Sequence, residues 1–266
     1  MSRIDDIRLK VNRANGHLED FKATIRGQRG TIHPPHAVGI HFQPQRQDIT
    51  ISSERVKPGQ QLEWGIILGD VVHQLRTVLD HVVYALATRT TTLTEKEIRH
   101  LNFPIHKDAN DFRADDAVRS GFFERVLGTD ELAEIERSQP YKRKAASPTS
   151  DELWLLKRLD DIDKHRTVFV LDNRIFIQGT AASEDSRVEH RFRFIKEPMK
   201  PETEVFDIGW PHPVPPTGVS MDDISRFVVF NETDPLCDGR ETIPVVRDII
   251  NAVDFTATAF DRFFPF

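Results

Sequence analysis

The sequence predicts an α+β fold, in which a helical bundle is joined to a mainly antiparallel sheet formed by residues 167–230. Apolar residues recur at intervals of three and four along much of the chain before residue 167, which is the spacing of helices that bury one face. After Arg166 the interval changes to two, the spacing of strands, and it returns to three and four near residue 243. Helices followed by consecutive strands favour an α+β fold over the alternating order of a parallel α/β fold.

Long helices are expected to form the bundle, at residues 4–26, 61–88, 151–166 and 243–264. The second of them has the longest uninterrupted apolar stripe, made of Leu68, Val72, Leu75, Leu79, Val82 and Leu86. Two shorter helices are expected at residues 111–127 and 129–138. Ser150 is expected to cap the helix that follows it, because Asp151 and Glu152 fall in the first turn, where the helix dipole favours negative charge.

Strands are expected at residues 48–56, 167–171, 174–177, 188–195, 203–208 and 225–230. No linker, internal repeat or low-complexity segment divides the chain. The sequence therefore predicts a single α+β domain over residues 1–266. Its helical bundle comprises residues 1–166 and 243–266, and its antiparallel sheet, residues 167–230, covers one side of the bundle.

The composition of the chain is typical of soluble globular proteins, since its 266 residues are 38% hydrophobic and 29% charged. No apolar run approaches the roughly 18 residues that a membrane helix needs. The charged N-terminus lacks the apolar stretch of a signal peptide, so we expect a cytoplasmic protein that does not associate with a membrane. The net charge of −6 disfavours non-specific binding of nucleic acid, which usually needs a basic protein.

Several familiar kinds of site are missing from the sequence. Cys237 is the only cysteine, so neither a disulfide framework nor a thiolate zinc site is expected. The expected helices contain no His-x-x-x-His or His-Glu-x-x-His spacing, and we therefore expect no bound metal. Glycine-rich phosphate loops, dinucleotide fingerprints and Gly-x-Ser-x-Gly elbows are absent as well, so no cofactor is expected.

The segment at residues 69–81 combines the apolar stripe of the second helix with two His, one Arg and two Asp. Four residues lie opposite the stripe on a helical wheel: His73, Thr77, Asp80 and Tyr84. Arg76 lies at the edge of this face and is four residues from Asp80, so the two side chains can pair. Two interpretations stay open, namely a solvated face with one intrahelical ion pair, or a face that meets RNA or a second subunit.

A second polar group belongs to the helix expected at residues 151–166. Asp163 and Arg166 project onto its apolar side, where unpaired charges are costly. Both are therefore expected to pair with Arg76 and Asp80 in a buried network. Three more ionisable residues line one flank of the same helix: Arg158, Asp161 and His165. This group is open to two interpretations, a structural ion network or a site built across two helices.

Four blocks in order make the chain similar to a widespread bacterial family of uncharacterised proteins. The blocks are residues 73–81 (HQLRTVLDH), 103–105 (FPI), 139–141 (QPY) and 153–166, which ends in DKHR. The blocks are spread over most of the chain. The resemblance implies a shared architecture and no particular activity.

Arg76 and His81 fit the pattern of Arg, four to six residues, then His on a helix. In this the chain resembles the HEPN superfamily, helical domains found in many bacterial toxins and antiviral ribonucleases. The resemblance implies metal-independent cleavage of RNA at a homodimer interface, with His81 in proton transfer and Arg76 stabilising the charge on the phosphate. The chain departs from the family pattern at Thr77, where Asn, Asp or His is usual, and in its large strand content.

Three functions therefore stay open, the third of which is a small-molecule binding or enzymatic pocket between the sheet and the bundle. The first is a HEPN-like, metal-independent endoribonuclease of the toxin or antiviral-defence type, which acts on RNA as a homodimer through the catalytic residues Arg76 and His81. The second is a non-catalytic interaction or regulatory protein that binds a protein partner and whose Arg, Asp and His residues form a structural ion network. The supporting network is expected to comprise His73, Asp80, Arg158, Asp161, Asp163, His165 and Arg166.

Overall fold

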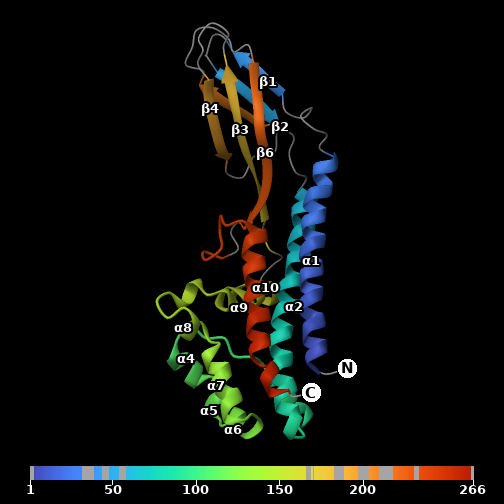
Figure 1. Ribbon diagram of the computed structural model, residues 1–266, viewed down its shortest axis with the longest axis vertical. Coiled ribbons are helices and arrows are strands. Elements are labelled where there is room, and N and C mark those ends of the chain that lie inside the picture. The colour runs from blue at the N-terminus through green and yellow to red at the C-terminus, as the bar shows by residue number, and fades with distance from the viewer. Residues whose placement is uncertain are drawn as a thin grey trace.

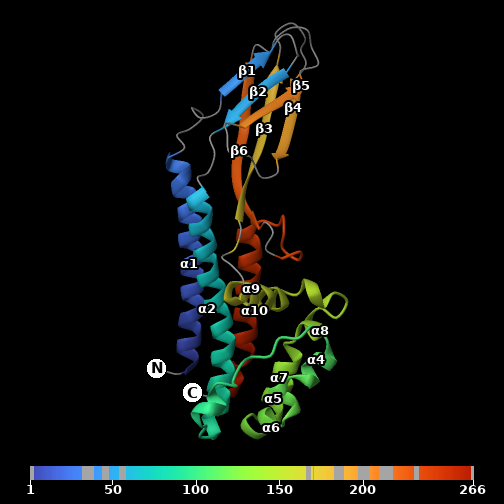
Figure 2. The same cartoon turned by 180° about the vertical axis from the view of Figure 1, so that it is seen from behind.

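The computed structural model describes the backbone of residues 3–31, 39–43, 48–53, 58–165, 169, 171–182, 189–196, 204–209, 218–230 and 234–264. Side chains are described over most of the helices and the turns between them, but in strands only at Leu171 and residues 228–230. The molecule is elongated, with the helices at one end and the strands at the other (Figures 1 and 2).

Four helices form the main body, and they lie where the apolar spacing predicts them. α1 (Arg3–Thr31) and α2 (Pro58–Thr90) form an antiparallel pair, and α10 (Thr242–Ala259) packs against both of them. α9 (Glu152–His165) crosses these helices and contacts α2 and α10 (Figures 1 and 2). Because α2 contacts the other three, it is the central helix of the body.

The core follows from the spacing of apolar residues in these helices. α1 buries one stripe at intervals of three and four residues: Ile7, Val11, Ala14, Leu18 and Phe21. α2 buries two adjacent stripes, made of Leu68, Val71, Val72, Leu75, Val78, Leu79, Val82, Val83 and Leu86. The double stripe is needed because α2 has helical neighbours on more than one side. Each fully buried Val, Leu or Ile side chain stabilises a fold by about 1.5–3 kcal/mol, so this cluster is the main source of stability.

A series of short helices lies beside the long ones, at the end away from the strands (Figures 1 and 2). They are α3 (Glu95–Ile98), α4 (Ala109–Ala114), α5 (Asp116–Arg119), α6 (Phe122–Val126), α7 (Thr129–Arg137) and α8 (Pro140–Arg143), followed by a 3₁₀ turn at Pro148–Ser150. The single helix predicted at 111–127 is therefore broken. Asp115 ends α4 and caps α5, and Gly121 turns the chain with a φ of 69°, a left-handed value that favours glycine.

α9 begins one residue later than predicted, and Asp151 caps it instead of Ser150. Oδ1 of Asp151 accepts a hydrogen bond from the N–H of Leu153 at 2.8 Å, which is the geometry of an N-cap. Asp151 is fully buried, and its Oδ2 accepts a hydrogen bond from Nε of Arg143 at 3.0 Å. This paired cap fixes the start of α9 and so the position of every charged residue further along the helix.

The predicted fold class is wrong. Residues 167–230 do not form one sheet that covers a side of the bundle. Where side chains are described the structure is mostly helical, and the only strand residues among them are Leu171 and residues 228–230. The strands lie beyond the end of the long helices, and β6 (Gly218–Phe230) leads back towards α10 (Figures 1 and 2).

The described strands divide into two groups of three, each joined by antiparallel pairing. β3 (Leu171–Ala182) lies between β4 (Glu189–Lys196) and β6. β2 (Asp48–Ser53) lies between β1 (Gly39–Gln43) and β5 (Glu204–Gly209), so this group draws on residues outside the predicted range. An apolar interval of two identifies strands but not their partners, which is why the sequence misassigned the arrangement.

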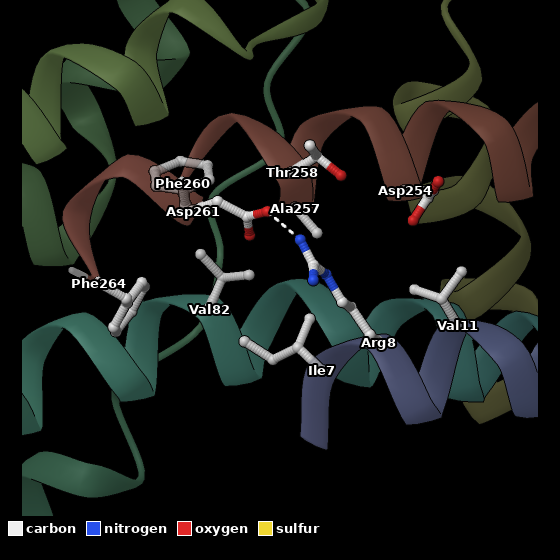
Figure 3. Close-up of a pocket in the computed structure, with 10 residues that line it drawn as sticks. All are labelled: Ile7, Arg8, Val11, Val82, Asp254, Ala257, Thr258, Phe260, Asp261 and Phe264. Atoms are coloured by element: carbon white, nitrogen blue, oxygen red, sulfur yellow. Dashed lines mark hydrogen bonds and ion pairs between the residues drawn. The ribbon is translucent and has the colours of Figure 1, made fainter. Parts of the chain in front are cut away.

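A small cavity lies among α1, α2 and the C-terminal end of α10 (Figure 3). Ile7, Val11 and Val82 line it, and Arg8 reaches across to form an ion pair with Asp261. Its volume of about 10 Å³ is close to the smallest that can hold one water molecule. The cavity is too small for a ligand, and the ion pair ties the start of α1 to the 3₁₀ turn at Asp261–Phe263.

Candidate functional site

Arg76 and Asp80 hold the backbone of Phe103 from two sides. Nη2 of Arg76 donates a hydrogen bond to the carbonyl oxygen of Phe103 at 2.7 Å, and Oδ1 of Asp80 accepts one from the N–H of Phe103 at 2.8 Å. Nη2 of Arg76 also lies 3.1 Å from Oδ1 of Asp80, so the predicted i,i+4 pair is confirmed. The Arg76 side chain is only 13% exposed. We call this arrangement the Arg76–Asp80 clamp.

Gln139, the residue before α8, holds the same segment from another part of the chain. Its Nε2 donates hydrogen bonds to the carbonyl oxygens of Pro104 at 2.8 Å and Ile135 at 2.9 Å. Its Oε1 accepts one from the N–H of His106 at 2.9 Å. Gln139 is fully buried, as a side chain with three such bonds can be. Residues 103–106, which we call the strap, are therefore fixed by side chains from α2 and from the start of α8.

The strap also packs into the core. Phe103 and Ile105 are buried, and the Phe103 ring meets the ring of Phe260 edge-on, with their centroids 6.2 Å apart. Phe260 follows the last residue of α10. The strap thus joins α2 to the C-terminal end of α10, and it holds the series of short helices against the main body.

The four residues of the strap are among those that line a groove of about 860 Å³, a volume in the range of small-molecule sites, and we call them the floor of this groove. Five Lys or Arg side chains line this groove: Arg76, Lys96, Arg119, Arg125 and Lys157. Two His residues, His100 and His106, lie with them, against three carboxylates, Glu97, Asp115 and Asp116. The lining is therefore basic, although the whole chain has a net charge of −6.

Some of these charges are paired within the groove. Nε2 of His106 lies 3.0 Å from Oδ2 of Asp115, and this contact is the main reason why the pKa of Asp115 is lowered. Arg125 pairs with Glu97, whose pKa is lowered chiefly by the N–H of Thr94. Lys96 and His100 have no ion-pair partner among the residues whose side chains are described.

Nη1 of Arg76 is buried and has no hydrogen-bond partner in the described part of the chain. A buried donor without a partner typically costs about 1–3 kcal/mol. Arg76 is also among the residues that line the groove. His81 is half-buried and is not among the residues that line the groove.

A second polar group lies where α9 crosses α2. Asp160 is the buried member, with a side chain 5% exposed, and its Oδ2 accepts a hydrogen bond from Nζ of Lys164 at 2.7 Å. Its Oδ1 has no hydrogen-bond partner among the described residues, and lies 3.9 Å from Nδ1 of the exposed His73. Asp163 lies against α2 at Gly69, where an added Cβ would be 2.5 Å from Oδ1 of Asp163.

Burial has the same effect on two carboxyls near this crossing. It raises the pKa of Asp163 above its ordinary value, and the neighbouring charge of Asp160 raises it further. It also raises the pKa of Asp80, although the Arg76 guanidinium partly opposes that shift. Both groups are therefore less stable as carboxylates in the folded protein than in water.

The network predicted for Asp163 is wrong. Among the described residues Asp163 makes no ion pair with Arg76, and it lies beside Gly69 and the charges of Asp70, His73 and Asp160. The two positions Asp160 and Asp163 differ by about 60° around the helix axis. The helical wheel could not show how α9 is rotated against α2, so it predicted Asp163 as the buried charge instead of Asp160. Arg166 and the side chain of His165 lie outside the described residues.

Arg158 and Asp161 make separate contacts. Arg158 donates two hydrogen bonds to Oδ2 of Asp234, from Nε at 3.0 Å and from Nη2 at 2.8 Å, and Asp234 is almost fully buried. This pair ties α9 to the turn before α10. Asp161 accepts a hydrogen bond from Lys157 at 2.7 Å on the outside of α9. The sequence did not indicate Asp160, Asp234 or Gln139 as site residues, although Asp160 and Gln139 lie within two of the four sequence blocks, residues 153–166 and 139–141.

Asp163→Asn should slightly stabilise the protein at neutral pH, by about 0.5 kcal/mol, or about 1–2 °C in Tm. The folded-state pKa of Asp163 is raised, so the folded protein binds more protons than the unfolded chain. The contribution of Asp163 to stability is then greatest below its unfolded pKa and falls as pH rises through the folded pKa. In thermal melts from about pH 3 to 8, the Tm should fall less with rising pH in Asp163→Asn than in the parent.

The control for this prediction is Asp161→Asn, because Asp161 is 44% exposed and, among the residues whose side chains are described, pairs only with Lys157. Its Tm should stay within about 1 °C of the parent at every pH. A lower Tm for Asp163→Asn than for the parent at neutral pH would contradict the repulsion between Asp163 and Asp160, and would mean that the Asp163 carboxylate stabilises the fold.

Within the described residues, no group of three or more His, Cys, Asp or Glu side chains is arranged to hold a metal ion. The described helices also include none that is long and apolar enough to cross a membrane. No protein-family model matches the chain, and neither the curated proteins nor the solved structures compared with it give a match. The geometry of the clamp, the strap and the groove therefore provides the indications of function.

Proposed function

We propose that this protein is a non-catalytic binding protein whose ligand site is the groove above the strap. The observation that carries this proposal is the position of Arg76. Its guanidinium binds the carbonyl oxygen of Phe103 and the carboxylate of Asp80. It is therefore already used to fix the strap that forms the groove floor.

The alternative, a HEPN-like endoribonuclease, would need Arg76 to bind a phosphate of RNA. Turning Arg76 away would leave Phe103 without its donor and Asp80 as a half-buried carboxylate without its cation. Breaking a buried pair in this way costs about 3–5 kcal/mol. Even without that movement, Asp80 beside the guanidinium repels an approaching phosphate.

The position of His81 supports the same proposal. A general acid or base must come within hydrogen-bond distance of the group it protonates. Five residues along an α-helix correspond to about 140° around its axis, so Arg76 and His81 diverge on α2. In agreement with this divergence, Arg76 lines the groove and His81 does not.

Incubation with total RNA in the presence of a chelator tests the proposal. The parent protein and His81→Ala should leave the RNA equally intact. His17→Ala on α1 is the control for a histidine that no hypothesis assigns to the site. Cleavage that leaves 2′,3′-cyclic phosphate ends, and that falls at least about a hundredfold in His81→Ala but not in His17→Ala, would overturn the proposal.

A further inference from the structure

The lining of the groove is opposite in charge to the chain as a whole. Five Lys or Arg residues face three carboxylates there, and two of the five, Arg76 and Lys157, pair with Asp80 and Asp161 outside the lining. The whole chain carries 36 Lys and Arg against 42 Asp and Glu. Two of the basic groups, Lys96 and His100, have no ion-pair partner among the described residues. Such a local excess of cationic groups, in a groove of about 860 Å³, favours an anionic ligand.

A third basic group can also be released at low cost. Arg119 pairs with Asp116 at 2.8 Å, but their side chains are 69% and 93% exposed. Ion pairs this exposed contribute about 0–1 kcal/mol, so a stronger acceptor can replace the carboxylate. A phosphate monoester is such an acceptor, because it carries close to two negative charges on three acceptor oxygens, whereas the carboxylate carries one charge on two oxygens.

The groove offers an apolar surface beside these cations. Phe103, Pro104 and Ile105 form its floor, and the half-buried Phe122 contributes to its wall. The guanidinium of Arg125 lies 5.2 Å from the centre of the Phe122 ring. A volume of about 860 Å³ is far larger than a free phosphate needs, so the lining suits a molecule that joins a phosphate to an apolar or aromatic group.

We propose that the groove binds a small organic phosphate of about nucleotide size. Its phosphate would lie at the Lys96, His100 and Arg119 side, and its organic group against Phe122 and the strap. This inference rests on the proposed function, since a groove whose floor depends on Arg76 serves binding and not catalysis. The acidic chain as a whole disfavours a long polyanion, which would meet repulsion beyond the groove.

Calorimetric titration of the whole chain with ADP and, separately, with inorganic pyrophosphate tests the ligand class. ADP should bind at one site per chain, and pyrophosphate should bind at least about tenfold more weakly because it lacks the organic group. Lys96→Gln combined with Arg119→Gln should weaken ADP binding at least about tenfold. The control, Lys10→Gln combined with Arg13→Gln on α1, makes the same change of charge outside the groove and should leave ADP binding unchanged.

The outcomes separate this inference from the proposed function. The ligand class would be overturned if ADP did not bind, if pyrophosphate bound as tightly as ADP, or if both double variants lost the same affinity for ADP. None of these results would affect the proposed non-catalytic role, provided that the RNA stays intact. Tighter binding of a single-stranded oligonucleotide than of ADP, with the same dependence on Lys96 and Arg119, would also overturn it in favour of nucleic acid. RNA cleavage that depends on His81 would overturn the proposed function itself.

Discussion

Arg76→Leu should lower the free energy of unfolding by on the order of 3 kcal/mol, or about 6–12 °C in Tm. The change removes the donor to the Phe103 carbonyl and leaves Asp80 without its cation. The pKa of Asp80 is already raised by burial, and the loss of Arg76 removes the largest effect that opposes this. Chemical denaturation followed by circular dichroism measures the loss.

Two further variants test whether the loss comes from the clamp. Arg119→Leu removes an arginine from an exposed pair and should change stability by less than about 0.5 kcal/mol. Asp80→Leu combined with Arg76→Leu should be clearly less harmful than the sum of the two single changes, because neither charge is then left unpaired. Additive losses would mean that Arg76 and Asp80 act independently, and the clamp would no longer argue against a catalytic Arg76.

The sequence could predict contacts within one helix, as in the Arg76–Asp80 clamp, but not contacts between segments, as at the crossing of α2 and α9. The pair of Arg76 and Asp80 depends only on helix geometry, because residues four apart are always neighbours. Its third member, the backbone of Phe103, comes from an irregular segment 23 residues beyond Asp80, and no periodic pattern places such a segment. At the crossing, the choice between Asp160 and Asp163 depended on a rotation of about 60° that only the packing of α9 determines.

The fold shows the same limit. The apolar spacing of α1, α2, α9 and α10 predicts their positions, because burial of one face leaves a regular mark on the sequence. Strand pairing leaves no such mark, and β2 joins β5 across more than half of the chain. Gln139 belongs to the unpredicted part as well. A Gln-Pro-Tyr block is visible in the sequence, but two of the three backbone groups that Gln139 binds, those of Pro104 and His106, lie 35 and 33 residues away and become its neighbours only in the folded protein.

Gln139→Leu should therefore destabilise the protein by on the order of 3 kcal/mol, although leucine has nearly the same volume and prefers a buried position. The substitution leaves the carbonyl oxygens of Pro104 and Ile135 and the N–H of His106 without the partners they have now. Each buried group left unpaired costs about 1–3 kcal/mol. Denaturation measures the total loss, and hydrogen exchange at the His106 amide reports the strap itself.

Gln74→Leu on α2 is the matched control, since Gln74 is half-buried and its replacement should change stability by less than about 0.5 kcal/mol. In Gln139→Leu the His106 amide should exchange at least about tenfold faster than in the parent, and ADP binding should weaken with it, because the strap is the groove floor. A variant as stable as the parent, with His106 equally protected, would show that α2 alone holds the strap. The groove would then owe its shape to the Arg76–Asp80 clamp and not to a segment fixed from both sides.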